Sequence, residues 1–130
     1  MLFRSMKFAV SATLAWFAVP VAAQYIDYPV SYMNLSGSAA AQTGPNANVA
    51  WIYMHDQSAL NHDGGSISWS YLYDQATESV RATQSWLFTY NQSAVTIGTG
   101  ADLSWLVMSD QTTAAFSGGN LGWAVVGGGA

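Results

Sequence analysis

The fold is decided by a stretch that runs Ser66-Ile67-Ser68-Trp69-Ser70-Tyr71-Leu72-Tyr73-Asp74-Gln75. Its first eight residues are rich in β-branched and aromatic side chains, and Ile67, Trp69 and Tyr71 lie two residues apart, which is typical of a β-strand. Asp74-Gln75 then predicts a turn, because short Asp and Asn side chains hydrogen-bond their own backbone and tolerate unusual φ angles. The stretch therefore predicts a strand that ends in a turn.

This stretch is one copy of a tandem repeat of about 18 residues. Its Trp recurs at spacings of 18, 17, 19 and 18, at Trp51, Trp69, Trp86, Trp105 and Trp123, and Tyr32 lies 19 residues before the first. A small residue precedes every Trp, and four copies carry Asp or Asn followed by Gln: Asp56-Gln57, Asp74-Gln75, Asn91-Gln92 and Asp110-Gln111. The outer copies have Gly37-Ser38 and Gly128-Gly129 at this place, and atypical terminal copies are usual in stacked repeat arrays.

Each copy predicts a strand, a turn and a shorter second strand such as Ala94–Ile97, so we expect an all-β repeat protein. A β-solenoid is favoured over an antiparallel meander or small barrel, because in a solenoid equivalent residues become neighbours, which explains why they are alike. In this fold the Trp and Gln residues would form ladders about 4.8 Å apart.

The chain is expected to divide into a signal peptide, residues 1–23, and a single β-repeat domain, residues 24–130. Arg4 and Lys7 precede an apolar run and Val21-Ala22-Ala23, which is the pattern of a cleavable export signal and is too short for a transmembrane helix. The predicted repeat units are 29–47, 48–65, 66–82, 83–101, 102–119 and a partial unit, 120–130. We therefore expect a secreted protein or one on the extracellular surface, with the periplasm as the alternative location.

Composition narrows the function classes. After residue 23 one basic residue, Arg81, stands against six Asp and one Glu, a formal net charge of −6. This acidic balance argues against nucleic acid as a partner. The chain has no Cys, so its stability must come from apolar burial and backbone pairing.

The recurring Trp residues have two interpretations. They could present one stacking platform per copy, or they could form the core, and the regular recurrence within alternating strands favours the core. The other face of the same strand is also apolar, with Ile52, Met54, Leu72, Leu87, Leu106 and Met108, and such a strand needs cover on both sides. That cover could come from the same fold or from a second copy.

No chemical site is predicted. The acidic turn residues could bind calcium, but one per copy is too few, and turn formation with a stacked Gln ladder is favoured. His55 and His62 occupy positions filled elsewhere by Tyr73 or Val80, so packing or surface roles are expected rather than catalysis or metal binding. Glu78 has no second carboxylate for hydrolysis. We therefore expect no enzyme activity, no metal and no cofactor.

The repeat resembles the curlin family of secreted bacterial fibre subunits, through tandem strand–turn–strand units, low charge, Gly-rich turns and Gln at a fixed place: Gln57, Gln75, Gln92 and Gln111. The resemblance implies a cell-surface fibre subunit that polymerises end to end. The leading hypothesis is thus a non-enzymatic structural or adhesive surface protein that self-associates through its Trp and Gln ladders. The alternative is a small lectin-like module that binds a carbohydrate or cell-surface polymer with its repeated aromatics.

Overall fold

The computed structural model describes residues 24–129, which contain twelve β-strands and no helix. The predicted signal peptide lies outside the described residues. The strands are β1 (Gln24–Ile26), β2 (Pro29–Leu35), β3 (Ala40–Thr43), β4 (Asn48–Met54), β5 (Ala59–His62), β6 (Ser66–Leu72), β7 (Thr77–Val80), β8 (Thr83–Thr89), β9 (Ala94–Ile97), β10 (Asp102–Met108), β11 (Thr113–Phe116) and β12 (Asn120–Val126).

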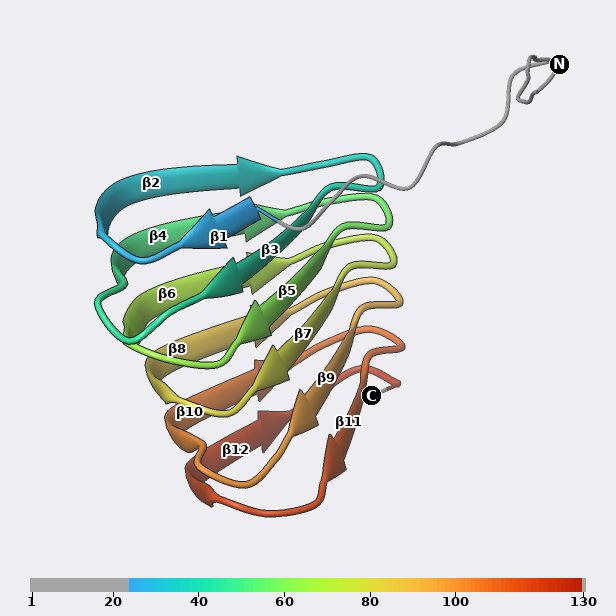
Figure 1. Ribbon diagram of the computed structural model, residues 1–130. Coiled ribbons are helices and arrows are strands. Elements are labelled where there is room, and N and C mark those ends of the chain that lie inside the picture. Colours follow the sequence, from blue (N-terminus) through green and yellow to red (C-terminus); the bar gives the residue numbers. More distant parts are fainter. Residues whose placement is uncertain (1–23, 130) are drawn as a thin grey trace, which may run out of the picture.

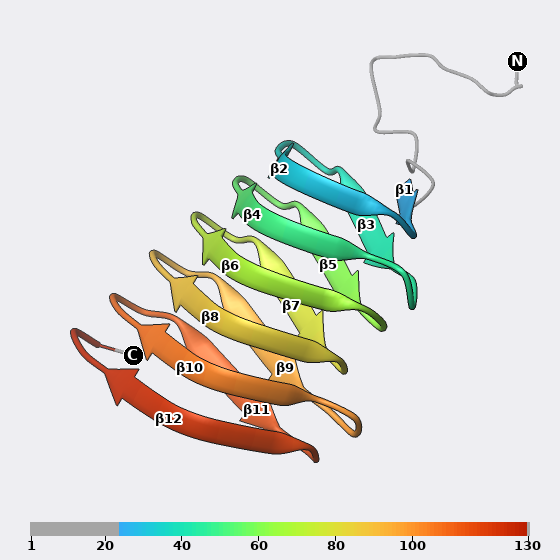
Figure 2. The same cartoon turned by 90° about the vertical axis from the view of Figure 1, so that its left-hand side faces the viewer.

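These strands form a β-solenoid of two parallel six-stranded sheets (Figure 1). The long seven-residue strands make one sheet in the order β12-β10-β8-β6-β4-β2, and the short strands make the other in the order β1-β3-β5-β7-β9-β11. Figure 2 shows the coils stacked one below the next along a single axis. The predicted solenoid is confirmed, because every strand pair is parallel, whereas a meander would pair its strands antiparallel.

The coils are stacked in register. Trp51 is paired with Trp69, Trp69 with Trp86, and Trp86 with Trp105, so each Trp lies directly above its equivalent in the next coil. β1 precedes the first predicted repeat unit and pairs with β3, as a short strand of one further coil. The loops from each short strand to the next long strand are two to four residues long, and they absorb the variation in spacing between 17 and 19 residues without breaking the register.

The core lies between the two sheets and is aliphatic. The long strands contribute residues such as Val49, Ile52 and Met54, each 0% exposed, and the short strands contribute Leu60 and Val80, at 1% and 0%. The apolar face that needed cover is therefore the inner face, and the second sheet of the same solenoid covers it.

The expectation that the recurring Trp residues form the core is wrong: they lie on the outer face of the long-strand sheet. Along β6, Ile67 and Ser70 are buried while Trp69, between them, is not. A strict period of two would put Ile67 and Trp69 on one face, but the inward–outward alternation shifts by one residue at Ser68, where the strand pairing is also interrupted. The shift is crowded at the equivalent Gly122, where an added Cβ would lie 2.7 Å from the carbonyl oxygen of Ser104.

Candidate functional site

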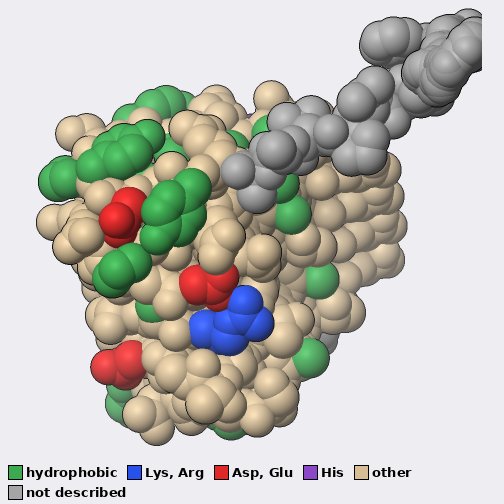
Figure 3. Space-filling model, viewed as in Figure 1, with side chains coloured by type: hydrophobic (Ala, Val, Ile, Leu, Met, Phe, Trp, Pro, Cys, Tyr) green, Lys and Arg blue, Asp and Glu red, His purple; other side chains and the backbone are tan. Residues whose placement is uncertain are grey.

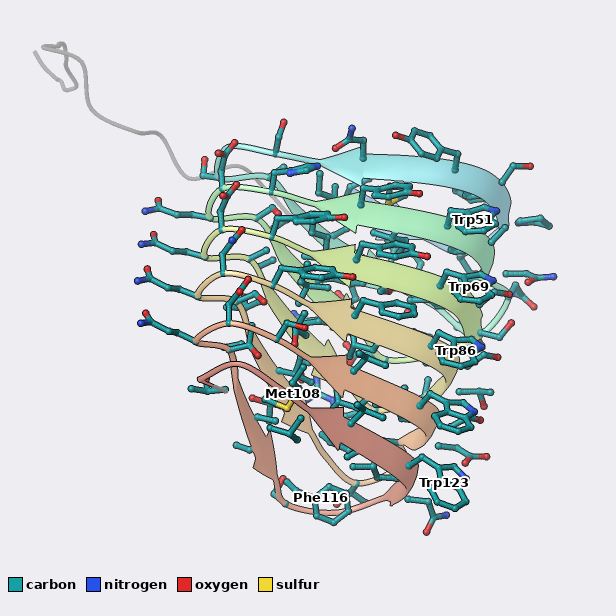
Figure 4. The ribbon with its side chains drawn as sticks, turned by 180° about the vertical axis from the view of Figure 1, so that it is seen from behind. Trp51, Trp69, Trp86, Met108, Phe116 and Trp123 are labelled. Atoms are coloured by element: carbon teal, nitrogen blue, oxygen red, sulfur yellow. The ribbon has the colours of Figure 1, made fainter. Side chains whose placement is uncertain are left out.

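A column of stacked indole rings runs along the outside of the long-strand sheet (Figure 4). Successive ring centroids lie 5.0–5.6 Å apart and the planes differ by 4–15°, for the pairs Trp51–Trp69, Trp69–Trp86, Trp86–Trp105 and Trp105–Trp123. Offset stacking of this kind stabilises aromatic pairs beyond the area they bury. The ladder predicted from the sequence is present, but on the outer surface.

Two further aromatic columns run beside the indoles. Tyr53, Tyr71 and Phe88 stack at 4.9 Å. In the third column Tyr73 lies 5.0 Å from both His55 and Tyr90. Partial burial raises the pKa of the Tyr71 and Tyr73 phenols, and the neighbouring phenols add to the shift. His55 is thus one ring of a stack, at the place that Tyr fills in the next coils.

The inner rings of the Trp column present their edges, not their faces, to solvent. Both faces of Trp69, Trp86 and Trp105 are covered by neighbouring indoles, and these rings are half-buried. Trp123, in the last coil, is 65% exposed and has a ring neighbour on one side among the described residues. A sugar that stacks on an aromatic needs a free ring face, so the column does not provide one such platform per copy.

The acidic turn residues form a second column at one corner of the coils. Asp56, Asp74, Asn91 and Asp110 all have φ between 57° and 61°, the left-handed conformation that Asp and Asn tolerate. Each side chain accepts a hydrogen bond from the backbone N–H of the equivalent residue one coil earlier, at 2.8–3.0 Å: Gly37 to Asp56, Asp56 to Asp74, Asp74 to Asn91 and Asn91 to Asp110. These oxygens therefore connect coils.

The Gln residues stand beside this corner and are exposed. The side-chain amide of Gln57 donates to Gln75 at 3.2 Å, and that of Gln75 donates to Gln92 at 3.5 Å, whereas Gln111 continues the column through its backbone, which donates to Asn91. In the described part of the chain no three His, Cys, Asp or Glu residues gather closely enough to hold a metal ion.

His62 is buried in the core rather than displayed. Its Nδ1 lies 2.8 Å from the hydroxyl of Thr43 and its Nε2 lies 2.6 Å from the carbonyl oxygen of Thr83. Burial lowers its pKa, and the bond to Thr83 offsets part of that shift. A neutral imidazole that donates to Thr83 and accepts from Thr43 satisfies both nitrogens.

Sequence reasoning missed a buried polar cluster made of Glu78, Ser70 and Gln84. All three are at most 2% exposed, and their columns are otherwise apolar in the neighbouring coils. The signal was present in the sequence, since Gln84 interrupts the apolar position before the Trp and Glu78 is the lone Glu of the chain. That the three meet in one place required knowledge of the coil.

The last coil exposes side chains that inner coils bury. Phe116 is 57% exposed and its neighbour in the column, Ile97, is 1% exposed; Val126 is 57% exposed and the residue above it, Met108, is 8% exposed. At the other end the difference is smaller, since Val30 and Met33 are half-buried. Within the described chain, β11 and β12 are the terminal strands of the two sheets at this end, and β1 and β2 are the terminal strands at the other end. Among the described residues, each of these four strands has a neighbouring strand on one side and an unpaired edge on the other.

The surface carries few charges. The face shown in Figure 3 has one basic patch, which touches an acidic one. This is the ion pair between Arg81 and Asp63, in which Nε lies 2.9 Å from the carboxylate. The one cation of the described chain is thus already paired.

No protein-family model, no curated protein and no solved structure matches this chain. Within residues 24–129 there is no helix with the length and apolar character needed to cross a membrane.

Proposed function

We propose that this chain is a secreted, non-enzymatic structural protein of the extracellular surface that self-assembles end to end by continuing its own solenoid. The observation that carries the proposal is the open last coil, in which Phe116, Trp123 and Val126 are each more than half exposed. An end of this kind, with an apolar cross-section and two sheet edges, favours association with another sheet edge.

The N-terminal end of a second copy fits this place. Short and long strands alternate along the chain, so the two strands that would follow β12 are a short strand and then a long strand. The first two strands of a second copy have this order, because β1 is short and β2 is long. β1 of the second copy would thus pair with β11, and its β2 with β12. This order repeats the succession of short and long strands found within each copy.

The aromatic columns support the same register. Trp123 is 65% exposed at one end and Tyr32 is 58% exposed at the other, and both occupy the indole column. Joining the ends would place Tyr32 against Trp123 and bury both rings. In this proposal the role in assembly that the sequence suggested for all the Trp residues belongs to Trp123 and to Tyr32, the residues at the two ends of the column.

The joint would be weaker than the contacts between inner coils. Inside the chain the Asp or Asn column gives one side-chain hydrogen bond at each of the four steps from Gly37 to Asp110, but at the joint Gly128 would meet Gly37, and neither has a side-chain acceptor. One such bond contributes about 1 kcal/mol. We therefore expect fibres to dissociate into folded copies before the solenoid itself unfolds.

Long-range electrostatics oppose assembly. Residues 24–130 carry a formal net charge of −6, so copies repel one another until salt screens the charges over about 10 Å at 0.1 M. Assembly is expected to be faster at higher ionic strength.

Two single-cysteine variants test the end-to-end register, because the chain has no Cys of its own. Asn34 and Val125 are exposed and occupy the same column at opposite ends. In the proposed joint their Cα atoms would lie about 4.8 Å apart, within the range of a disulfide. Asn34→Cys and Val125→Cys should cross-link to each other when mixed under oxidising conditions.

Each variant alone is the matched control. Rapid homodimers of Val125→Cys with no mixed product would show tail-to-tail contact and overturn the proposed register. A chain that stays monomeric at high concentration and salt, with no fibres by electron microscopy, would overturn assembly itself.

A further inference from the structure

We propose that Glu78, Ser70 and Gln84 form a pH-sensitive element in the middle of the solenoid, which loosens the coils between β6 and β9 when Glu78 loses its proton. The proposal concerns the single folded chain and holds whether or not copies assemble.

The cluster replaces apolar residues in three adjacent columns. Glu78 lies between Leu60 and Val95 on the short-strand sheet. Facing it from the long-strand sheet, Ser70 takes a place that Ile52 and Leu87 fill in the neighbouring coils. Gln84 likewise takes the place of Ile67 and Leu103. The smaller Ser70 leaves room for the carboxyl group in a core that is otherwise aliphatic.

The surroundings suit a neutral carboxyl better than a charged one. Neither carboxyl oxygen of Glu78 has a hydrogen-bond partner within the described chain, and the same is true of the Ser70 hydroxyl and the Gln84 carbonyl oxygen. One N–H of the Gln84 amide donates to the carbonyl oxygen of Trp86 at 3.2 Å, which leaves its second N–H as a donor. A protonated Glu78 brings a donor to two acceptors, whereas a carboxylate brings a charge to a place whose free donors are two neutral groups, the Ser70 hydroxyl and the second Gln84 N–H.

Burial raises the pKa of Glu78 to about 8, and the neighbouring Ser70 and Gln84 side chains offset part of the shift. Of the side chains that β5, β6, β8 and β9 turn toward the core in the described chain, His62 alone is titratable, and none is charged near neutral pH. Its pKa is lowered by burial. No buried cation is therefore present among them to stabilise a carboxylate.

The direction of the pH effect follows from linkage. Between pH 4.5 and about 8 the folded chain holds a proton on Glu78 that the unfolded chain releases, so the unfolding equilibrium constant rises tenfold per pH unit. His62 acts in the opposite sense below 6.5, because the unfolded chain there gains a proton that the folded one does not. Glu78 thus dominates between pH 6.5 and 8. Because the rise flattens as the pH approaches 8, and because unfolded His62 still binds some proton near pH 6.5, the constant should rise roughly tenfold over this window.

Urea unfolding of the full chain at pH 6.5 and pH 8, at a concentration where it is monomeric, tests the proposal. Glu78→Gln should remove the roughly tenfold dependence. Glu78→Leu, which restores the column residue of β5, provides a second variant should the amide fail to fold. The matched control is Asp74→Asn, which removes an exposed carboxylate at a position where the next coil has Asn91; it should retain the dependence.

Hydrogen exchange locates the effect. Amides of β6–β9 should lose protection at pH 8 more than those of β3 and β4 after correction for intrinsic rates. An unfolding constant that changes less than threefold between pH 6.5 and 8, or a Glu78→Leu variant with an undiminished dependence, would overturn the proposal. Neither outcome bears on assembly, because both measurements are made on monomers.

Discussion

Replacing one indole inside the aromatic column and one at its end should give opposite phenotypes. Trp86 stacks on Trp69 at 5.3 Å and on Trp105 at 5.0 Å, whereas Trp123 stacks on Trp105 alone among the described residues, at 5.6 Å. An aromatic pair contributes about 0.5–1.5 kcal/mol beyond area burial. Trp86→Val, which introduces a β-branched side chain that suits a strand, should therefore lower the free energy of unfolding by about 2–3 kcal/mol.

Trp123→Val should lower the stability of the monomer by about 1 kcal/mol, because the ring is 65% exposed and loses one stacking partner. Its main effect should be on assembly, since the proposed joint buries this ring against Tyr32 of the next copy. Trp86→Val should leave the ends, and hence assembly of the folded fraction, unchanged.

The two quantities are measured separately. Stability is followed by far-UV circular dichroism in urea at low concentration, and assembly by light scattering at high concentration in 0.3 M salt. Equal losses of stability in the two variants would refute the edge-on column described above. Unimpaired assembly of Trp123→Val would refute its place in the joint.

Three further predictions concern the interior and the corners. Asp74→Ala should lower the free energy of unfolding in urea by about 1–2 kcal/mol, because Ala tolerates φ of 57° poorly and its side chain accepts no hydrogen bond. Asp74→Asn should be nearly neutral, and equal losses of stability in the two variants would contradict the role of the corner column. In His62→Val the free energy of unfolding should rise as the pH falls from 6.5 to 4.5, because the effect of Glu78 is then no longer opposed by that of His62. In the unsubstituted chain the two effects partly cancel, so identical pH profiles of the two chains would contradict this prediction. Gly65→Ala should cost about 3 kcal/mol or more in thermal unfolding, since φ is 71° and the added Cβ would collide with the Ala47 carbonyl group; a near-native melting temperature would disprove this backbone geometry.

The period and the register could be predicted from the sequence. Several positions recur together, and residues that are alike at a constant spacing are best explained as neighbours in a stack. Asp74 and its equivalents also predicted the turn correctly, because left-handed backbone conformations select Asp, Asn and Gly.

The inner and outer faces could not be predicted, because both faces of the long strands are apolar. Trp69 and Leu72 are equally compatible with a core by hydrophobicity alone. The alternation shifts at Ser68, and no local propensity reveals a shift of one residue. The space between two sheets is filled by aliphatic side chains, and the indoles stack outside.

The buried polar cluster could be predicted only in part. The exceptions at Gln84 and Glu78 were visible, but each taken alone suggested nothing. Their meeting with Ser70 depends on which residues of the two sheets face each other across the core, and that follows from the lengths of the turns.

Electron cryomicroscopy of assembled fibres tests most directly whether the solenoid continues from one copy to the next. Each copy contributes six strands to each sheet, so at about 4.8 Å per strand the rise per subunit should be about 29 Å along the fibre axis. A rise of about 4.8 Å per subunit, as in fibrils where every chain adds a single layer, would contradict the account.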